Sequence, residues 1–321
     1  MPLSEFEVIN RFFASHGLKR PEVTLGIGDD AALITPPSGQ QLVVSTDTLI
    51  AGVHFPHETS AGDIGYKSLA VSLSDLAAMG AEPLAVTLAL TLPEADESWL
   101  AEFTEQFFLL ADSFNVQLIG GDTTRGALSI TVQALGLLPC DQGLTRAGAQ
   151  VGDLVYVTGE LGDAGLALLV LQGELRLPVK DKAQVLKRLN RPTARIGAGI
   201  ALRNIASAAI DISDGLVADL SHILKASDVG ATLQAGKLPV SDVYRRTFDV
   251  AGDWSVALSA GDDFELCFTV PEKRQGEIER IMSGLEVRCS WIGMIEQRQG
   301  LRVLDDIGRE IHTGSGYDHF R

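Results

Sequence analysis

The sequence predicts a mixed α/β protein built from two domains. Stretches with apolar residues at helical spacing alternate along the whole chain with short runs of β-branched and aliphatic residues. The chain has 321 residues, more than the ~100–200 of a typical domain. Residues 139–152 are glycine-rich and show little apolar periodicity. We therefore expect an N-terminal domain over residues 1–138, a linker over 139–152 and a C-terminal α/β domain over 153–321.

The first half is expected to combine amphipathic helices with strands. Residues 63–79 place apolar side chains every three or four positions and meet stop signals at Gly80 and Pro83, and residues 98–114 predict a second helix. The segment MPLSEFEVINRFFASHG has the spacing of a surface helix and lacks the order of a signal peptide. Strands are predicted at QLVVSTDTLI, AVTLALTL, VQLIGG and ALSITVQALGLL.

The second half predicts strands at LVYVTG, AAIDIS, ATLQA and FELCFTV. Residues 157–168, VTGELGDAGLAL, resemble a glycine-rich strand-to-helix turn, which we interpret as tight helix packing because no further dinucleotide signature accompanies it. No apolar stretch reaches the ~18 residues of a membrane span. We expect a chain without a membrane partner.

Charge and cysteine content narrow the function further. The net charge is −16, and a nucleic-acid partner would require a basic face. An acidic protein that binds phosphate needs metal ions to bridge the two sets of negative charge. Cys140, Cys267 and Cys289 lie far apart and form no CxxC pair, which favours a reducing, cytoplasmic location.

Several short polar motifs of the first half could bind metal or phosphate. In GIGDDAAL, Asp30 could face a site, or could belong to a surface Asx turn. In VVSTDTL, Ser45, Thr46 and Asp47 offer oxygens suited to a hard cation, or could cap the end of a strand. Asp75 lies inside a helix with an apolar, alanine-rich face, where burying a carboxylate is costly unless it is paired or binds metal.

Two further first-half segments also have a structural alternative. IGGDTTRG follows a strand and offers close backbone approach at Gly121 and a carboxylate at Asp122, or could form a hairpin turn. His54 of GVHF is a tentative substrate contact, and a structural histidine is the alternative.

In the second half, polar residues follow one apolar strand and precede another. AAIDISDGL places Asp211, Ser213 and Asp214 at a strand-to-helix crossover, where a metal or phosphate role competes with simple helix capping. SAGDDFELCF places Asp262 with further carboxylates before a strand. No P-loop, kinase-type glycine loop or Ser-His-Asp arrangement is present.

In order along the chain, the eight motifs GIGDDAA, STDTLIAGVHF, SLSDLAAMGAEP, GGDTTRG, LTRAGAQVGD, DISDGL, GDDFEL and GYDHF resemble those of thiamine-monophosphate kinases. The resemblance spans almost the entire chain. It implies the two-domain aminoimidazole ribonucleotide synthetase-like fold, with the N-terminal domain contributing a sheet to a homodimer. It also implies ATP- and Mg²⁺-dependent phosphorylation of thiamine monophosphate to thiamine diphosphate in the cytoplasm, with several Mg²⁺ ions.

The resemblance also implies roles for individual residues. No catalytic residue is implied beyond the metal ligands. The metal ligands would be Asp30, Ser45, Thr46, Asp47, Asp75, Asp122, Asp211 and Asp214. ATP would contact Gly121, Asp122, Arg146 and Ser213. Thiamine monophosphate would contact His54, Asp262 and Tyr317. The family often has tryptophan where this chain has Tyr317, and glutamate where it has Asp262. Both changes keep the chemistry, because tyrosine can still stack on a cationic ring.

We hypothesise direct in-line transfer from ATP to the substrate phosphate. Asp47, Asp75 and Asp122 would hold the ions, and Arg146 would add positive charge. Two rival functions remain open at this point. One is an ATP-dependent ligase or synthetase of the same superfamily, and the other is a non-catalytic Mg²⁺ or nucleotide sensor.

Overall fold

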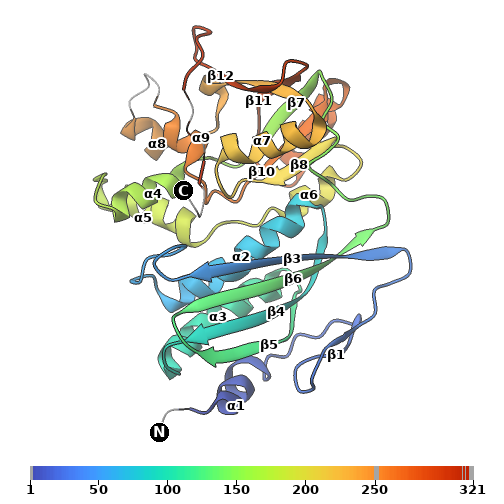
Figure 1. The fold of residues 1–321 in the computed structure, drawn as a ribbon, viewed down its shortest axis with the longest axis vertical. Coiled ribbons are helices and arrows are strands. Elements are labelled where there is room, and N and C mark those ends of the chain that lie inside the picture. Colours follow the sequence, from blue (N-terminus) through green and yellow to red (C-terminus); the bar gives the residue numbers. More distant parts are fainter. Residues whose placement is uncertain (1–2, 249–252, 313, 315, 318–321) are drawn as a thin grey trace. The chain divides into compact units, whose positions relative to one another are not determined.

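The computed structural model describes residues 3–248, 253–312, 314, 316 and 317. The chain forms two compact units. The first comprises Met1–Leu76 with Ala81–Asp141, and the second comprises Ala77–Gly80 with Gln142–Arg321. Each unit has its own main sheet (Figure 1). The predicted mixed α/β class is confirmed.

The first unit is built on a four-stranded sheet in the order β3-β6-β4-β5. Its strands are β3 (Gln40–Ile50), β4 (Glu82–Leu92), β5 (Gln117–Arg125) and β6 (Ser129–Pro139). β6 pairs antiparallel with β3 and β4, whereas β5 pairs parallel with β4 and forms an edge. A separate two-stranded sheet pairs β1 (Val23–Leu25) with β2 (Leu33–Ile34).

Helices α2 (Ala61–Ala78) and α3 (Glu97–Ser113) lie on one face of this sheet (Figure 1). Their sequences explain the packing, since both carry apolar side chains at helical spacing. The α2 side chains fill the interior, and Asp96 caps α3 by accepting a hydrogen bond from the Trp99 backbone N–H at 2.8 Å. Both helices confirm the sequence prediction.

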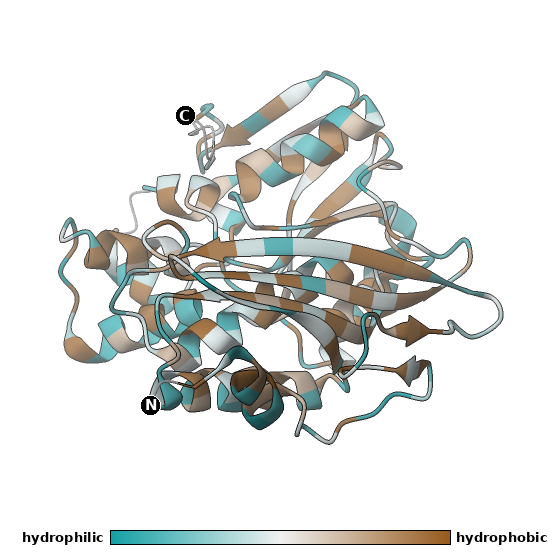
Figure 2. Ribbon diagram, turned by 60° about the horizontal axis from the view of Figure 1, so that its bottom comes forward, coloured by the Kyte–Doolittle hydropathy of each residue, from teal (hydrophilic) through white to brown (hydrophobic). Residues whose placement is uncertain are grey.

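The opposite face of β3 is open. Alternate residues of this strand are exposed, including Val44 at 54%. A hydrophilic centre at residues 45–48 separates two hydrophobic stretches of the strand, residues 42–44 and 49–50 (Figure 2). The polar run therefore lies inside β3, and the predicted alternative of a cap at a strand end is wrong for Asp47, because pairing with β6 continues to Ile50.

The N-terminal segment of the first unit is helical, as expected. α1 (Glu5–Val8) begins with a capping box between Ser4 and Glu7 and continues into a π-helical turn, η1 (Ile9–Phe13). Phe13 is buried.

The second unit contains a six-stranded sheet in the order β12-β9-β11-β7-β10-β8. Its strands are β7 (Asp153–Thr158), β8 (Ala208–Asp211), β9 (Gly230–Gln234), β10 (Leu266–Pro271), β11 (Cys289–Glu296) and β12 (Gly300–Leu304). β7 is buried along its whole length, which explains its continuous apolar run. The strands predicted in this half are confirmed, whereas β11 and β12 were not predicted.

Helices surround this second sheet (Figure 1). They are α4 (Asp163–Leu171), α5 (Val179–Asn190), α6 (Ile196–Leu202), α7 (Leu216–Ser227), α8 (Asp242–Thr247), α9 (Ser255–Ser259) and α10 (Gln275–Gly284), with short 3₁₀ turns η2 (Ala235–Lys237) and η3 (Glu272–Arg274). A Cβ on Gly165 of α4 would lie 2.5 Å from the Val256 side chain and 2.4 Å from Ala260. This contact confirms that the glycines here serve close helix packing. Within the described ranges, no helix is long and apolar enough to cross a membrane.

Candidate functional site

The carboxylates of Asp47 and Asp75 form the centre of the first unit's candidate site. β3 alternates its side chains, so Ser45 and Asp47 lie together on the less exposed side of the strand. The Ser45 hydroxyl donates a hydrogen bond to Asp75 Oδ2 on α2. Asp75 thus lies inside a helix, as predicted, and the site joins one strand to one helix.

The surroundings of Asp47 disfavour the charged form of its carboxyl group. Its Oδ2 atom is buried and has no hydrogen-bond partner among the residues that the structure describes. Burial, followed by the neighbouring Asp75 carboxylate, raises the pKa of Asp47 to about 6. An orphaned carboxylate oxygen beside a second carboxylate and a hydroxyl is a donor set that fits a hard divalent cation.

The remaining predicted metal ligands of this unit do not join that cluster as side chains. Thr46 faces the other side of β3, where its hydroxyl accepts a hydrogen bond from Gln133 Nε2 at 3.5 Å. Asp30 and Asp122 are exposed and line a separate cavity. Over the described ranges, no group of three or more His, Cys, Asp and Glu side chains is arranged to hold a metal ion.

This cavity has a volume of about 820 Å³ and lies within the first unit. Apolar side chains of the N-terminal helices, including Ile9 and Phe13, form part of its wall. The GIGDD turn and the glycine-rich part of β5, Gly120–Thr123, complete it. The Asp30 backbone N–H donates to Asp29 Oδ1 at 2.8 Å, so Asp29 stabilises this turn locally. An apolar wall beside exposed carboxylates and glycines is typical of a small-molecule site.

The segment GGDTTR belongs to strand β5, so the alternative of a hairpin turn is wrong. Pairing with β4 continues through Arg125 after a register shift beside Val86. Gly121 has φ +150°, and a Cβ there would lie 1.8 Å from the Leu88 carbonyl oxygen. Only glycine fits this position, because the backbone of β4 occupies the space of a side chain.

His54 is held by its own loop. The Ile50 backbone N–H donates to His54 Nδ1 at 3.0 Å, which fixes Nδ1 as the acceptor. The Lys67 ammonium donates to the His54 carbonyl oxygen at 3.3 Å. These contacts support a structural role for His54, and they fix the ring orientation that a substrate contact would also need.

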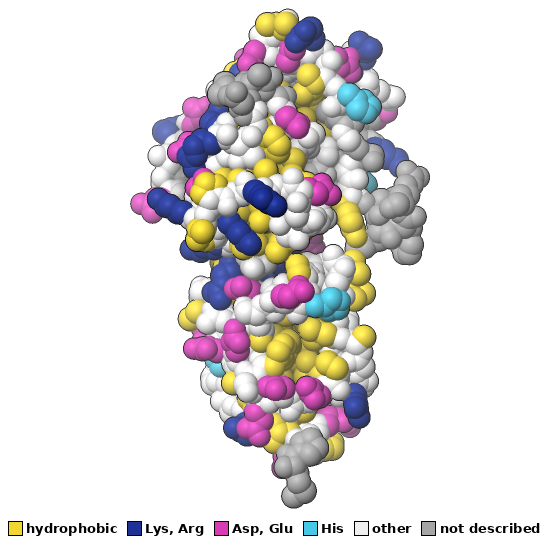
Figure 3. Space-filling model, turned by 90° about the vertical axis from the view of Figure 1, so that its left-hand side faces the viewer, with side chains coloured by type: hydrophobic (Ala, Val, Ile, Leu, Met, Phe, Trp, Pro, Cys, Tyr) yellow, Lys and Arg dark blue, Asp and Glu magenta, His cyan; other side chains and the backbone are white. Residues whose placement is uncertain are grey.

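The face of the first unit in the lower half of Figure 3 shows how the charge is distributed. Asp and Glu side chains border a patch of hydrophobic side chains on this face. A phosphate ligand that approaches it meets negative charge, as the sequence charge of −16 predicts.

Three predicted motifs meet within the second unit. The Asp262 backbone N–H donates to the Ser213 carbonyl oxygen at 2.8 Å, and the Tyr317 N–H donates to the Asp214 carbonyl oxygen at 3.1 Å. The structure therefore brings together the DISDGL loop, the GDDFEL turn and the terminal aromatic motif. Tyr317 is 50% exposed. Residues 318–320 of that motif lie outside the described residues.

Asp219 organises the DISDGL loop, and the sequence prediction missed it. Its Oδ2 atom accepts hydrogen bonds from the backbone N–H groups of Ser213 and Asp214, both at 3.0 Å. Asp219 is buried, and this burial raises its pKa to about 7. Helix α7 follows Gly215 without a side-chain cap. The only sequence signal was a carboxylate in the otherwise apolar first turn of the helix.

The two remaining predicted residues differ in exposure. Asp211 is 6% exposed at the end of β8, where it pairs with Leu266. Arg146 has an exposed side chain, and its carbonyl oxygen accepts a hydrogen bond from the Ser227 hydroxyl at 3.3 Å.

Comparison with protein families shows two matching domain models. The N-terminal domain of the AIR synthase related proteins matches residues 28–138, and their C-terminal domain matches residues 150–306. The sequence is 47% identical to the thiamine-monophosphate kinase of Escherichia coli (strain K12), over 100% of this chain and 99% of the other. It is 34% identical to that of Bacillus subtilis (strain 168), over 99% of this chain and 100% of the other.

Solved structures share the fold. The crystal structure of thiamine-monophosphate kinase from Stenotrophomonas maltophilia K279a matches with a TM-score of 0.87 and 48% identity, over 94% of this chain and 97% of the other. AaThiL complexed with AMPPCP and TMP matches with a TM-score of 0.76 and 30% identity, over 89% of each chain. The hydrogenase maturation protein HypE of E. coli, at 19% identity and a TM-score of 0.77 over 98% of each chain, shares the fold alone.

Proposed function

The chain belongs to the thiamine-monophosphate kinases of the AIR synthase related family, and we propose that it transfers the γ-phosphoryl group of ATP to thiamine monophosphate, giving thiamine diphosphate and ADP. The observation that carries this proposal is the 47% identity to the E. coli kinase over the full length of the chain. A relative of 30% identity has been solved with AMPPCP and TMP, an ATP analogue and the acceptor.

The cavity of the first unit suits the nucleotide. The apolar side chains of Ile9 and Phe13 give a wall against which a base can pack, and about 820 Å³ accommodates a ligand of that size. Gly121 and Asp122 line the same cavity, so the phosphates would leave it along the edge of β5. Ser213 and Arg146 of the second unit are the further predicted ATP contacts.

Mg²⁺ is the metal that the donor set fits. Asp47 and Asp75 supply carboxylates and Ser45 a hydroxyl, while Asp30 and Asp122 present carboxylates at the cavity. Bound Mg²⁺ would neutralise charge on the phosphates. Thr46 and the carboxylates of Asp211 and Asp214 complete the predicted ligand set.

The phosphoryl transfer requires no covalent bond between the substrates and the chain. An oxygen of the substrate phosphate attacks the γ-phosphorus in line, a P–O bond forms, and the bond to the β,γ-bridging oxygen breaks as ADP leaves. The attacking oxygen is already ionised near neutral pH, so no general base is needed. The residues of the chain align the two phosphates and exclude misplaced water.

Three residues are the predicted contacts of the acceptor. Asp262 and Tyr317 lie beside the DISDGL loop of the second unit. The half-exposed ring of Tyr317 can stack on the cationic thiazolium, a contact worth about 0.5–2 kcal/mol. His54 of the first unit, oriented through its Nδ1 atom, is the third predicted contact.

Homodimer formation and a cytoplasmic location are part of the proposal. The open face of β3 exposes Leu42, Val44 and Ile50, which a second copy of the chain would cover. The three cysteines are free thiols, which suits a reducing compartment.

A phosphate-transfer assay tests the proposed function. The protein is supplied with Mg²⁺ and ATP, and thiamine monophosphate, thiamine and other phosphate esters are compared as acceptors. We expect ADP and thiamine diphosphate to form only with thiamine monophosphate. ADP formation without any acceptor would contradict the proposal. Preference for a different small molecule, joined to a second one at the expense of ATP, would also contradict it and would indicate a ligase or synthetase. Nucleotide binding without turnover would indicate a sensor.

A further inference from the structure

The turn that carries Asp262 has an unusual backbone. Asp262 has φ +61° and Phe264 has φ +49°, and Gly261 before them has φ +74°. Left-handed backbone is rare for residues other than glycine, and rarer still for a bulky residue such as phenylalanine. Each such residue costs about 1–3 kcal/mol and persists only when the surrounding structure over-determines it.

Asp263 anchors this turn on one side. Both of its carboxylate oxygens accept hydrogen bonds from the Gly162 backbone N–H, at 2.9 and 3.1 Å. Asp263 is 4% exposed, and burial raises the pKa of its carboxyl group well above the usual range. Gly162 itself has φ +88°, and a Cβ there would lie 2.7 Å from the Tyr244 ring. A glycine is therefore needed at position 162, because a larger residue would collide with Tyr244.

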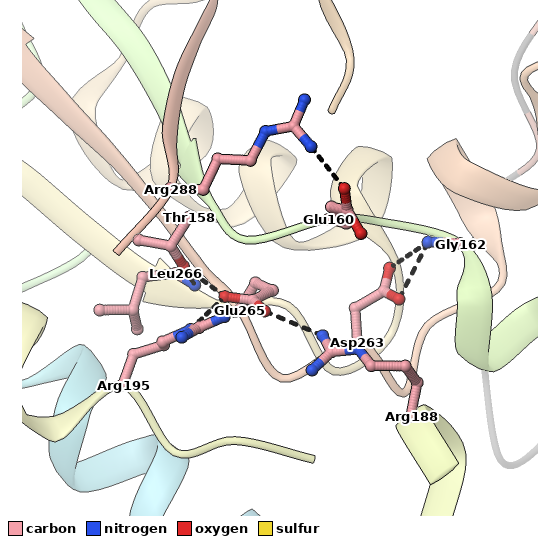
Figure 4. Close-up of polar contacts among 9 residues, drawn as sticks. All are labelled: Thr158, Glu160, Gly162, Arg188, Arg195, Asp263, Glu265, Leu266 and Arg288. Atoms are coloured by element: carbon pink, nitrogen blue, oxygen red, sulfur yellow. Dashed lines mark hydrogen bonds and ion pairs between the residues drawn. The ribbon is translucent and has the colours of Figure 1, made fainter. Parts of the chain in front are cut away.

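Glu265 anchors the turn on the other side. It is fully buried. Arg195 donates to it from Nε and Nη2 at 2.5 and 2.6 Å, and Arg188 donates from Nη2 at 2.9 Å. The Thr158 hydroxyl adds a fourth hydrogen bond at 2.7 Å. Figure 4 shows Glu265 between the two arginines.

The rest of the loop is fixed from a third direction. The Phe264 N–H donates to the Ile212 carbonyl oxygen at 2.8 Å, next to the bond from Asp262 to Ser213. The Thr158 hydroxyl also accepts the Leu266 backbone N–H at 2.8 Å, so it links Glu265 to the start of β10. The residues on both sides of Asp262 are thus held by hydrogen bonds to residues that lie far away in the sequence.

We infer that Asp263 and Glu265, with Thr158, Arg188 and Arg195, are positioning residues that hold the 261–264 turn in its left-handed form and so place Asp262 against thiamine monophosphate. The inference rests on the role of Asp262 given under the proposed function. Core stability is a weak explanation for the cluster, because replacing a buried ion pair with well-packed apolar residues is often neutral or stabilising.

A pair of substitutions at Thr158 tests the inference with little disturbance. Thr158→Val removes the hydroxyl and keeps the shape, whereas Thr158→Ser keeps the hydroxyl. We expect Thr158→Val to weaken binding of thiamine monophosphate, measured by titration calorimetry without ATP, by about tenfold, because the hydroxyl's hydrogen bonds to Glu265 and to the Leu266 N–H are both lost. Thr158→Ser should restore binding to within about threefold of the wild type. Binding of a non-hydrolysable ATP analogue should change by about twofold or less in both.

A control separates positioning from general loss of stability. Val303 is buried in β12 and belongs to the core of the same unit. Val303→Ala should lower the unfolding midpoint at least as much as Thr158→Val and leave the affinity for thiamine monophosphate unchanged. If both variants weaken binding equally, the inference is overturned.

A double-mutant cycle shows whether the cluster acts through Asp262. Thr158→Val and Glu265→Gln should each weaken binding of thiamine monophosphate in the wild type but change it little in an Asp262→Ala background, because the group that they position is then gone. Effects that are equal in both backgrounds would overturn the inference and leave the role of Asp262 intact. If Asp262→Ala alone binds like the wild type, the proposed role of Asp262 is wrong, and the inference falls with it.

Discussion

Replacing Gly121 by alanine should disrupt the edge of the first unit's sheet. A Cβ at this position would lie 1.8 Å from the Leu88 carbonyl oxygen and 2.5 Å from its carbonyl carbon. Real Cβ atoms essentially never come closer than 3.0 Å, so β5 would have to move away from β4 by about 1.2 Å. Such a shift breaks the parallel pairing that places Asp122 beside the cavity.

The expected loss of stability follows from two terms. The φ of +150° costs a non-glycine residue about 1–3 kcal/mol, and overpacking against backbone costs about another 1–3 kcal/mol. At about 3 °C for each kcal/mol, the unfolding midpoint of Gly121→Ala should fall by roughly 6–18 °C. Thermal unfolding followed by circular dichroism measures this fall. Titration with an ATP analogue should show weaker binding in the folded variant.

Gly120→Ala provides the matched control. A Cβ on Gly120 meets no heavy atom within 4 Å, so this variant should unfold within about 2 °C of the wild type. Equal midpoints for the two variants, or a Gly121→Ala protein as stable as the wild type, would refute the reasoning.

Three further results are expected. Asp75→Asn should abolish phosphoryl transfer while circular dichroism shows an intact fold, because it replaces a carboxylate of the candidate metal cluster with a neutral amide of similar size. Wild-type activity would disprove the assignment. Asp219→Ala leaves two backbone N–H groups without their acceptor and should lower the free energy of unfolding by about 1–3 kcal/mol in urea titration; an unchanged midpoint would show that the DISDGL loop holds itself. Burial raises the pKa of the Cys289 thiol to about 12 and leaves little thiolate at pH 8, so iodoacetamide should label the exposed Cys140 first. Faster labelling of the partly buried Cys289, detected by mass spectrometry, would contradict its raised pKa.

Local sequence patterns predicted the secondary structure correctly where the apolar residues followed a single regular spacing. The helix that carries Asp75 has apolar residues at regular spacing and ends at Ala78, just before Gly80 with its φ of +69°. The AAID strand and the following crossover were also visible, because β8 is short, fully buried and followed by a polar turn. These features depend only on residues that are close in sequence.

Tertiary pairing decided the features that local patterns missed. Gly and Asp favour turns, yet GGDTTR is extended because β4 supplies hydrogen-bond partners along its length. β11 is interrupted by a register shift near Gly293, so its alternation is irregular.

The candidate site was predictable in its residue types but not in its grouping. Ser45 and Asp47 share a side of β3 that Thr46 does not, which follows only once the run is known to be a strand. The partners of Glu265 lie between 70 and 107 residues away along the chain, so no sequence spacing indicates them.

Rapid-quench analysis of a single turnover tests the central claim most directly. The protein is mixed with Mg²⁺, thiamine monophosphate and ATP labelled in its γ-phosphate, and the label is followed in protein, nucleotide, free phosphate and thiamine species. Direct transfer predicts that label passes from ATP to thiamine diphosphate with no labelled protein at any time. Label that appears first on a residue of the chain, or that is released as free phosphate in place of thiamine diphosphate, would contradict the account.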